Sequence, residues 1–308
     1  MPKNHNEYTT HSIYIMTELQ TGLVISHLGK GIAVEVDNSI ILCQTRRKLE
    51  TVATGDKVKI TIVAKDQGRI EELLPRHSLL ERPNKGNKTR PVAANIDQIF
   101  VVFATEPYCD FLLIDQYLAI CENRNINALL IYNKADLAAS KNIEQELATY
   151  LDLGYPLFRV SAKDNIGIEQ LQQALSHKIS IFTGQSGVGK SSLTNSLIPD
   201  KDLKTNTVSA ITKHGRHTTT AATLYHLPES GDLIDSPGVA IFGLAGLSEQ
   251  QLAQGYREFQ PFIDQCKFND CRHVKDKGCA VRNAVEDGMI SEVRYQRFLK
   301  LREKMPTE

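Results

Sequence analysis

The feature that most constrains this chain is the sequence GQSGVGKS at positions 184–191. It matches G-x-x-x-x-G-K-[ST], a loop whose backbone N–H groups surround a phosphate at the start of a helix. An apolar run, KISIF, precedes it and SSLTNSLI follows, so we expect a strand, a phosphate loop and a helix. Lys190 is expected to act as a catalytic group on the β- and γ-phosphates, and Ser191 to bind Mg²⁺. The residues expected around the nucleotide are Gly184, Gln185, Ser186, Gly187, Val188, Gly189, Lys190, Ser191 and Ser192.

A second motif, NKAD, follows the apolar run ALLIY. The carboxylate of Asp136 can accept hydrogen bonds from the N1–H and the exocyclic amine of guanine, two donors that adenine does not offer together. We expect Asn133 to support this loop and the base, and the aliphatic stem of Lys134 to lie against the ring. A solvated aspartate that caps a helix is the alternative. A third motif after the next apolar run favours guanine binding, and its residues are Ser161, Ala162 and Lys163.

The sequence LIDSPG supplies a D-x-x-G motif after a short apolar run. We expect Asp235 to reach Mg²⁺ through water and the Gly238 N–H to bond the γ-phosphate. A threonine should complete the Mg²⁺ shell, with a polar loop as the alternative, and the candidates are Thr218, Thr219 and Thr220, of which we take Thr219. Residues 239–242 are apolar where many GTPases have a glutamine that orients the attacking water. This predicts slow intrinsic hydrolysis. His217 is the candidate catalytic residue or, equally, a surface histidine.

Hydrophobic patterning divides the rest of the chain. Between residue 18 and about residue 74, apolar and polar residues alternate, as in GIAVEV and KVKITIV, which predicts a small antiparallel unit such as a five-stranded barrel. Residues 81–91 include two prolines and a glycine and are expected to be a linker or mobile loop. From 92 to 245, continuous apolar strands alternate with helices, which predicts a mostly parallel sheet covered on both faces.

Three of the six cysteines lie close together in CKFNDCRHVKDKGC. Their spacing suits one tetrahedral, structural zinc ion, and the expected ligands are Cys266, Cys271, His273 and Cys279. Free thiols are the alternative. Residues 246–308 are expected to form a helical domain that depends on this metal for much of its folding energy, because its short helices bury little surface.

The order of the motifs is unusual, because NKAD and SAK precede the phosphate loop, whereas ordinary GTPases have them after it. This order predicts a circularly permuted GTPase. With a β-unit in front, with GQSGVGKSSLTNSL, GRHTTTA and DSPG, and with the Cys–His cluster behind, the chain resembles the RsgA/YjeQ family over residues 18–304. The resemblance implies an OB-fold at residues 18–80, a permuted GTPase domain at 92–245 and a zinc domain at 246–308. It also implies that His217 is the catalytic histidine.

The same resemblance implies a cytoplasmic GTPase that hydrolyses GTP to GDP and phosphate, is stimulated by the 30S ribosomal subunit, and assists its late maturation in contact with 16S rRNA. The alternative is an RNA-binding scaffold that holds GTP as a static ligand. We expect a monomer with a flexible tail at residues 1–17. We expect no membrane contact, because no apolar run approaches the ~20 residues of a spanning helix.

The charges do not by themselves identify a nucleic-acid surface. There are 36 basic and 36 acidic residues, so any RNA contact must come from local patches. One candidate patch is RRK at residues 46–48. The other is the final predicted helix, with Arg294, Arg297, Lys300 and Lys304, for which a solvated charged face is the alternative.

Overall fold

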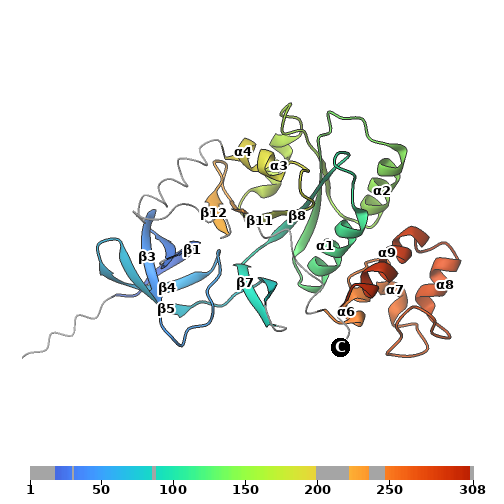
Figure 1. The fold of residues 1–308 in the computed structure, drawn as a ribbon, viewed down its shortest axis with the longest axis horizontal. Helices are drawn as coiled ribbons and strands as arrows, with labels where there is room; N and C mark the ends of the chain where they lie inside the picture. Colours follow the sequence, from blue (N-terminus) through green and yellow to red (C-terminus); the bar gives the residue numbers. More distant parts are fainter. Residues whose placement is uncertain (1–17, 30, 85–87, 199–221, 236–246, 306–308) are drawn as a thin grey trace, which may run out of the picture.

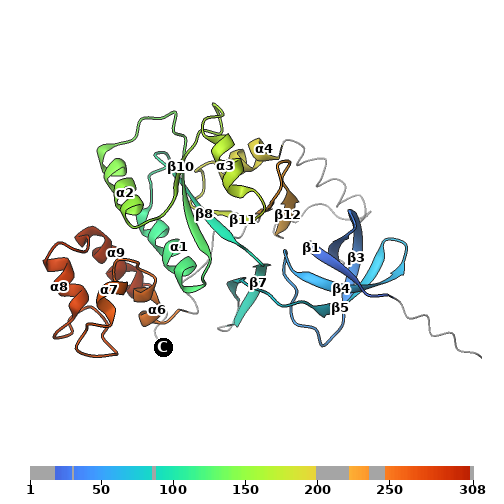
Figure 2. The ribbon, with the colours of Figure 1, turned by 180° about the vertical axis from the view of Figure 1, so that it is seen from behind.

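The structure is a computed structural model that describes residues 18–29, 31–84, 88–198, 222–235 and 247–305 (Figures 1 and 2). Its first part is a barrel of five strands, the OB-type unit that the sequence predicts. The strands are β1 (Gln20–Leu28), β2 (Gly31–Val36), β3 (Ser39–Thr45), β4 (Lys57–Ala64) and β5 (Gln67–Leu73). They pair in the order β1-β2-β3-β5-β4, and β4 returns to β1 to close the barrel. The fully buried side chains of Val24, Val34, Ile60 and Ile70 fill its interior.

A β-hairpin joins the barrel to the next part of the chain. It consists of β6 (Leu79–Asn84) and β7 (Lys88–Ala94), which pair antiparallel from Leu79↔Ala94 to Asn84↔Lys88. Residues 81–91, expected to be a linker or loop, therefore lie largely in paired strands. Both prolines are accommodated because a two-stranded sheet leaves N–H positions that need no partner. Ala94 N–H donates to the carbonyl oxygen of Thr54 at 2.9 Å, so the hairpin is also attached to the barrel.

The central part is a G domain built on a mostly parallel sheet. Its elements are β8 (Gln98–Ala104), α1 (Phe111–Asn123), β9 (Asn127–Asn133), α2 (Lys141–Asp152), β10 (Leu157–Arg159), α3 (Ile168–Leu175), β11 (Ile179–Thr183), α4 (Lys190–Leu197), β12 (Thr223–His226) and β13 (Asp232–Asp235). Across the sheet the strands lie in the order β10-β9-β8-β11-β13-β12. The first five run parallel to one another, and β12 runs antiparallel to its neighbour β13.

Helices cover both faces of this sheet, and the alternation of side chains along β8 shows why. Ile99, Val101 and Phe103 point into a core shared with α1 and α2, whereas Phe100 and Val102 point into a core shared with α3 and α4. All five side chains are at most 3% exposed, so the strand must be apolar throughout. Figure 2 shows the two helical layers on opposite sides of the strands.

The last part of the described chain consists of short helices, the first and last of which pack against α1. They are α6 (Glu249–Gln254), α7 (Gln260–Ile263), α8 (Ala280–Glu286) and α9 (Glu292–Glu303). Tyr256, Phe259 and Phe298 form its aromatic core, with Phe259 and Phe298 at 5.1 Å between ring centroids. Gly255 lies against α1, where a Cβ atom would come within 2.7 Å of the Ala119 backbone. This close approach fixes the helical domain on the G domain (Figure 1).

Candidate active site

The phosphate loop has the predicted setting, since it connects the end of β11 to the first residue of α4. Gly189 has φ of +95°, and a side chain there would collide with the amide nitrogen of Asn133, so this position requires glycine. Lys190 Nζ donates to the carbonyl oxygens of Gly184 at 2.8 Å and Gln185 at 2.7 Å. The lysine therefore lies across the loop, where it can meet phosphate oxygens.

The electrostatic setting of Lys190 links it to the D-x-x-G motif. Burial lowers the pKa of its ammonium group, and the negative charge of Asp235 acts in the opposite direction. Asp235 is the last residue of β13, and β13 runs parallel to β11, with Ile181 opposite Ile234. Because the carboxyl ends of parallel strands meet at one edge of a sheet, the carboxylate lies beside the phosphate loop.

The NKAD motif contacts the phosphate loop directly. Asn133 Nδ2 donates to the carbonyl oxygen of Val188 at 2.8 Å, and Lys134 Nζ donates to that of Gly187 at 3.0 Å. Lys134 Nζ also donates to the carbonyl oxygen of Glu106 at 2.7 Å. The motif predicts a contact of Asn133 and Lys134 with the base, but it does not indicate Glu106, because Glu106 contributes its backbone carbonyl, which leaves no signal in residue type.

The SAK motif contacts NKAD in turn. Ser161 Oγ donates to Asp136 Oδ1 at 2.8 Å, and this hydrogen bond lowers the pKa of the Asp136 carboxyl group. Asp136 is exposed, so its remaining lone pairs face solvent in an ionised carboxylate. The backbone N–H of Ala162 donates to Asn133 Oδ1 at 3.4 Å. Three sequence motifs thus converge on one edge of the sheet. The remaining predicted residues, His217, Thr218, Thr219, Thr220 and Gly238, lie outside the described residues.

A second cluster lies between α7 and α8. The ligand atoms of its four residues all lie within 4.8 Å of one another, and the residues are Cys266, Cys271, His273 and Cys279. Tyr295 donates its hydroxyl to the carbonyl oxygen of His273 at 2.7 Å, and Arg282 N–H points at Cys279 Sγ at 3.4 Å. Three soft sulfur donors and one imidazole at this spacing fit tetrahedral zinc with no position left for water, which is typical of a structural site.

Comparison with known proteins decides the family. Residues 73–245 match the model of the RsgA GTPase family, whose description is "RsgA GTPase". The chain belongs to this family. RsgA GTPases hydrolyse GTP, so the chain is a GTP hydrolase, as the sequence motifs predict.

Individual relatives agree with this assignment over most of the chain. The RsgA 1 protein of Vibrio vulnificus, described as a small ribosomal subunit biogenesis GTPase, is 42% identical over 94% of this chain and 85% of its own length. The RsgA of Pseudomonas fluorescens is 43% identical over 93% of this chain and 86% of its own length. The crystal structure of YjeQ from Thermotoga maritima superimposes with a TM-score of 0.75 at 31% identity, covering 93% of this chain and 98% of that one.

A further solved structure supports the permuted arrangement of the fold. YloQ, described as a circularly permuted GTPase, superimposes with a TM-score of 0.71 at 24% identity and covers 99% of this chain and 100% of its own. In this RsgA chain the same permutation places NKAD, at the end of β9, and SAK, after β10, ahead of the phosphate loop. None of the helices in the described ranges has the length and apolar content that a membrane crossing requires.

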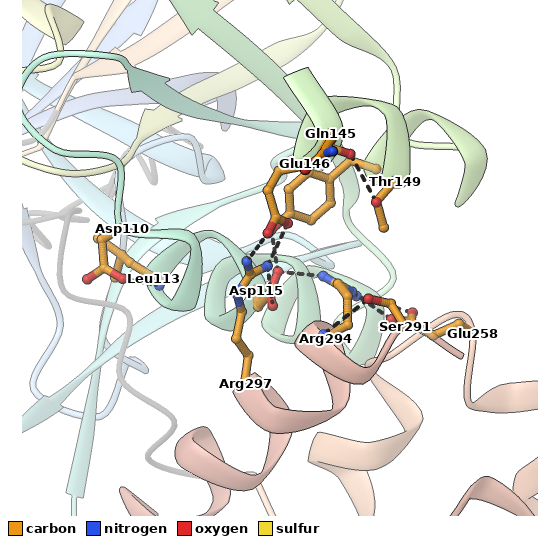
Figure 3. A network of polar contacts seen from close by, with 11 residues as sticks. Asp110, Leu113, Asp115, Gln145, Glu146, Thr149, Glu258, Ser291, Arg294 and Arg297 are labelled. Atoms are coloured by element: carbon orange, nitrogen blue, oxygen red, sulfur yellow. Dashed lines mark hydrogen bonds and ion pairs between the residues drawn. The ribbon is translucent and has the colours of Figure 1, made fainter. Parts of the chain in front are cut away.

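For two arginines of α9, the hypothesis of RNA contact is wrong. Arg294 is 2% exposed and bonds Asp115 of α1 and Glu258, while Arg297 bonds Glu146 of α2 (Figure 3). Their guanidinium groups attach the helical domain to the G domain and cannot reach a phosphate from this position. Lys300 and Lys304, further along the helix, are exposed.

Proposed function

We propose that this chain binds GTP with the base read by Asp136 and hydrolyses it to GDP and phosphate at the phosphate loop. The convergence of the loop, NKAD and SAK supports this, because each motif holds the next through a hydrogen bond. Lys190 would stabilise the charge that develops on the β- and γ-phosphates. The same edge of the sheet would receive guanine, since the Asp136 carboxylate faces solvent beside Ala162 and Lys163.

Mg²⁺, when bound, would neutralise charge on the phosphate oxygens. Ser191, in the first turn of α4, and Asp235, at the end of β13, would hold it together with a threonine, for which we retain Thr219. The donor set fits, because hydroxyl and carboxylate oxygens are the ligands that Mg²⁺ prefers.

We also propose that the partner is the small ribosomal subunit, bound through 16S rRNA during its late maturation in the cytoplasm, and that the chain acts as a monomer. The printed names of the relatives refer to biogenesis of that subunit. On the barrel, Arg47 and Lys48 are exposed between β3 and β4, where they can meet RNA phosphates, whereas Arg46 pairs with Glu71. The barrel and the helical domain would then contact the subunit from either side of the GTPase domain.

The deciding experiment measures GTP hydrolysis alone, with purified 30S subunits and with 50S subunits. We expect stimulation by 30S particles that falls steeply with salt, and none by 50S particles. Binding to 30S particles with no change in hydrolysis would instead support a scaffold that holds GTP as a static ligand.

The catalytic role of His217 needs a separate measurement. Single-turnover hydrolysis by His217→Ala should be slowed about a hundredfold if the imidazole orients or activates water, with nucleotide affinity unchanged. A wild-type rate would remove the histidine from the mechanism but leave the GTPase assignment intact.

A further inference from the structure

The barrel and the G domain share one continuous sheet. β1 of the barrel pairs with β12, and the sheet runs through eleven strands from β10 to β4. At the junction, Ser26 of β1 lies opposite Thr223 of β12, and Thr223 lies opposite Asp235 of β13. Residues directly opposite on neighbouring strands project from the same face of a sheet. A single row of side chains therefore leads from the barrel to the carboxylate beside the phosphate loop.

Buried hydroxyl groups of the barrel hold the start of β12. Ser26 Oγ donates to the carbonyl oxygen of Ala222 at 2.9 Å, and Thr54 Oγ1 donates to the same oxygen at 3.1 Å. Ser26 Oγ also lies 3.0 Å from Thr223 Oγ1. Ser26 and Thr54 are 2% and 0% exposed, so water cannot replace these hydrogen bonds without opening the junction.

The other end of β12 is attached to the barrel by charged groups. The imidazole of His226 bonds Glu35 of β2 at 2.7 Å and Asp232 of β13 at 2.6 Å. Both strands of the β12–β13 hairpin are thus held to the barrel, one directly and one through the histidine. Displacing the hairpin would break contacts at both ends together.

We propose that Ser26 and Thr54 are positioning residues for GTP hydrolysis, which fix the β12–β13 hairpin so that Asp235 is held at the Mg²⁺ site. This rests on the proposed function, since it takes Asp235 as a group that holds Mg²⁺. Among the described residues, the hydrogen bonds of the phosphate loop and NKAD do not involve Ser26, Thr54 or Ala222. Loosening the junction should therefore raise the Mg²⁺ concentration that the site requires and slow GTP hydrolysis, but leave guanine recognition unchanged.

The test compares Ser26→Ala, Thr54→Val and the double variant with the unmodified chain. Three quantities are measured: GDP affinity in EDTA, the Mg²⁺ concentration that half-maximally slows GDP release, and single-turnover GTP hydrolysis. For each hydroxyl lost we expect about a fivefold higher Mg²⁺ requirement and about a fivefold slower hydrolysis. GDP affinity in EDTA should stay within about twofold of the unmodified chain.

Two matched controls separate positioning from general stability. Thr61→Val removes a hydroxyl from a buried threonine of β4, and it should leave the Mg²⁺ requirement and the hydrolysis rate unchanged. Thr54→Ser and Ser26→Thr retain the hydroxyl groups and should restore both quantities. Thermal unfolding of every variant identifies those that remain folded.

Wild-type Mg²⁺ dependence and hydrolysis in the folded double variant would overturn the proposal. If the double variant does not fold, the two single variants decide in the same way. If instead the proposed function is wrong, the result is different. Either Asp235→Asn leaves the Mg²⁺ requirement unchanged, or the unmodified chain does not hydrolyse GTP.

Discussion

Arg294 of α9 forms an ion pair with Asp115 of α1, and both side chains are buried, at 2% and 0% exposed (Figure 3). Arg294 Nε also donates to Glu258 Oε1 at 2.6 Å, and the Tyr150 hydroxyl donates to Asp115 Oδ1 at 2.5 Å. Burying these charges costs free energy that only a complete set of partners offsets. The network therefore specifies one docking position for the helical domain on the G domain.

The first prediction concerns the loss of one charge from this network. Asp115→Asn leaves the buried guanidinium of Arg294 without its partner on α1, and we expect a loss of about 3–5 kcal/mol in the free energy of unfolding. Denaturant unfolding of the zinc-loaded chain, followed by circular dichroism, measures this loss. Because Asp115 does not touch the nucleotide motifs, GDP affinity of the folded variant should be unchanged.

The control replaces both charges by apolar groups. Asp115→Leu combined with Arg294→Met removes both members of this ion pair, although Glu258 still loses its arginine. The loss of unfolding free energy in the double variant should therefore be smaller than the sum of the losses in the two single variants. Additive losses would mean that the two side chains contribute independently and that the ion pair does not specify the docking position.

The second prediction concerns pH. The hydrogen bonds and negative charges of Asp232 and Glu35 raise the pKa of His226 from its usual value of 6.5 to about 9. Since the raised pKa belongs to the folded state, the stabilisation is fully present below about pH 6.5 and is lost as the pH rises through about 9. The difference in melting temperature between the unmodified chain and His226→Gln should shrink over this range.

Taking the difference between the two proteins at each pH removes the contribution of groups that titrate in both, such as cysteines. His177→Gln is a suitable control, because His177 is an exposed histidine of the same domain. It should show no such pH-dependent difference. A constant difference between the His226 variant and the unmodified chain across the range would contradict a charged histidine at the junction.

The third prediction concerns the metal cluster. Removal of zinc by a chelator should abolish much of the helical signal of α6 to α9, because the cluster joins the segment that follows α7 to the start of α8. Guanine-nucleotide affinity should stay within about twofold, because within the described ranges no ligand of the cluster bonds the phosphate loop, NKAD or SAK.

Two cysteine variants sharpen this test. Cys271→Ser should lose bound zinc, whereas Cys43→Ala, which removes a buried thiol from the barrel, should keep it. Retained helicity in the chelated protein would show that the aromatic core around Phe259 folds without metal.

Local patterns in the sequence predicted the barrel, the permuted G domain, the convergent nucleotide motifs and the Cys–His cluster, because each depends on short-range periodicity or spacing. They did not predict the β6–β7 hairpin, because Pro83 and Pro91 are typical of loops, although its two strands are neighbours in the sequence. Nor did they show that Arg294 is buried. Its neighbours Tyr295 and Phe298 identify the apolar face of the helix, but the acidic partner Asp115 lies 179 residues away.

The last prediction concerns base specificity. In the proposed function the Asp136 carboxylate would accept two hydrogen bonds from guanine, and Asp136→Asn replaces it with an amide that has only one acceptor oxygen. Hydrogen bonds to a charged group contribute about 1.5–3 kcal/mol each, so the loss of one of them should lower GTP affinity by about ten- to a hundredfold. The amide N–H matches the oxygen that xanthine carries in place of the guanine amine, so xanthosine triphosphate should bind the variant better than GTP does.

Asp164→Asn is the control, because it removes an exposed carboxylate from the adjacent loop, and it should change the affinity for neither nucleotide. Competition of each nucleotide against a fluorescent GDP analogue measures both, and undiminished GTP binding by Asp136→Asn would place base recognition elsewhere.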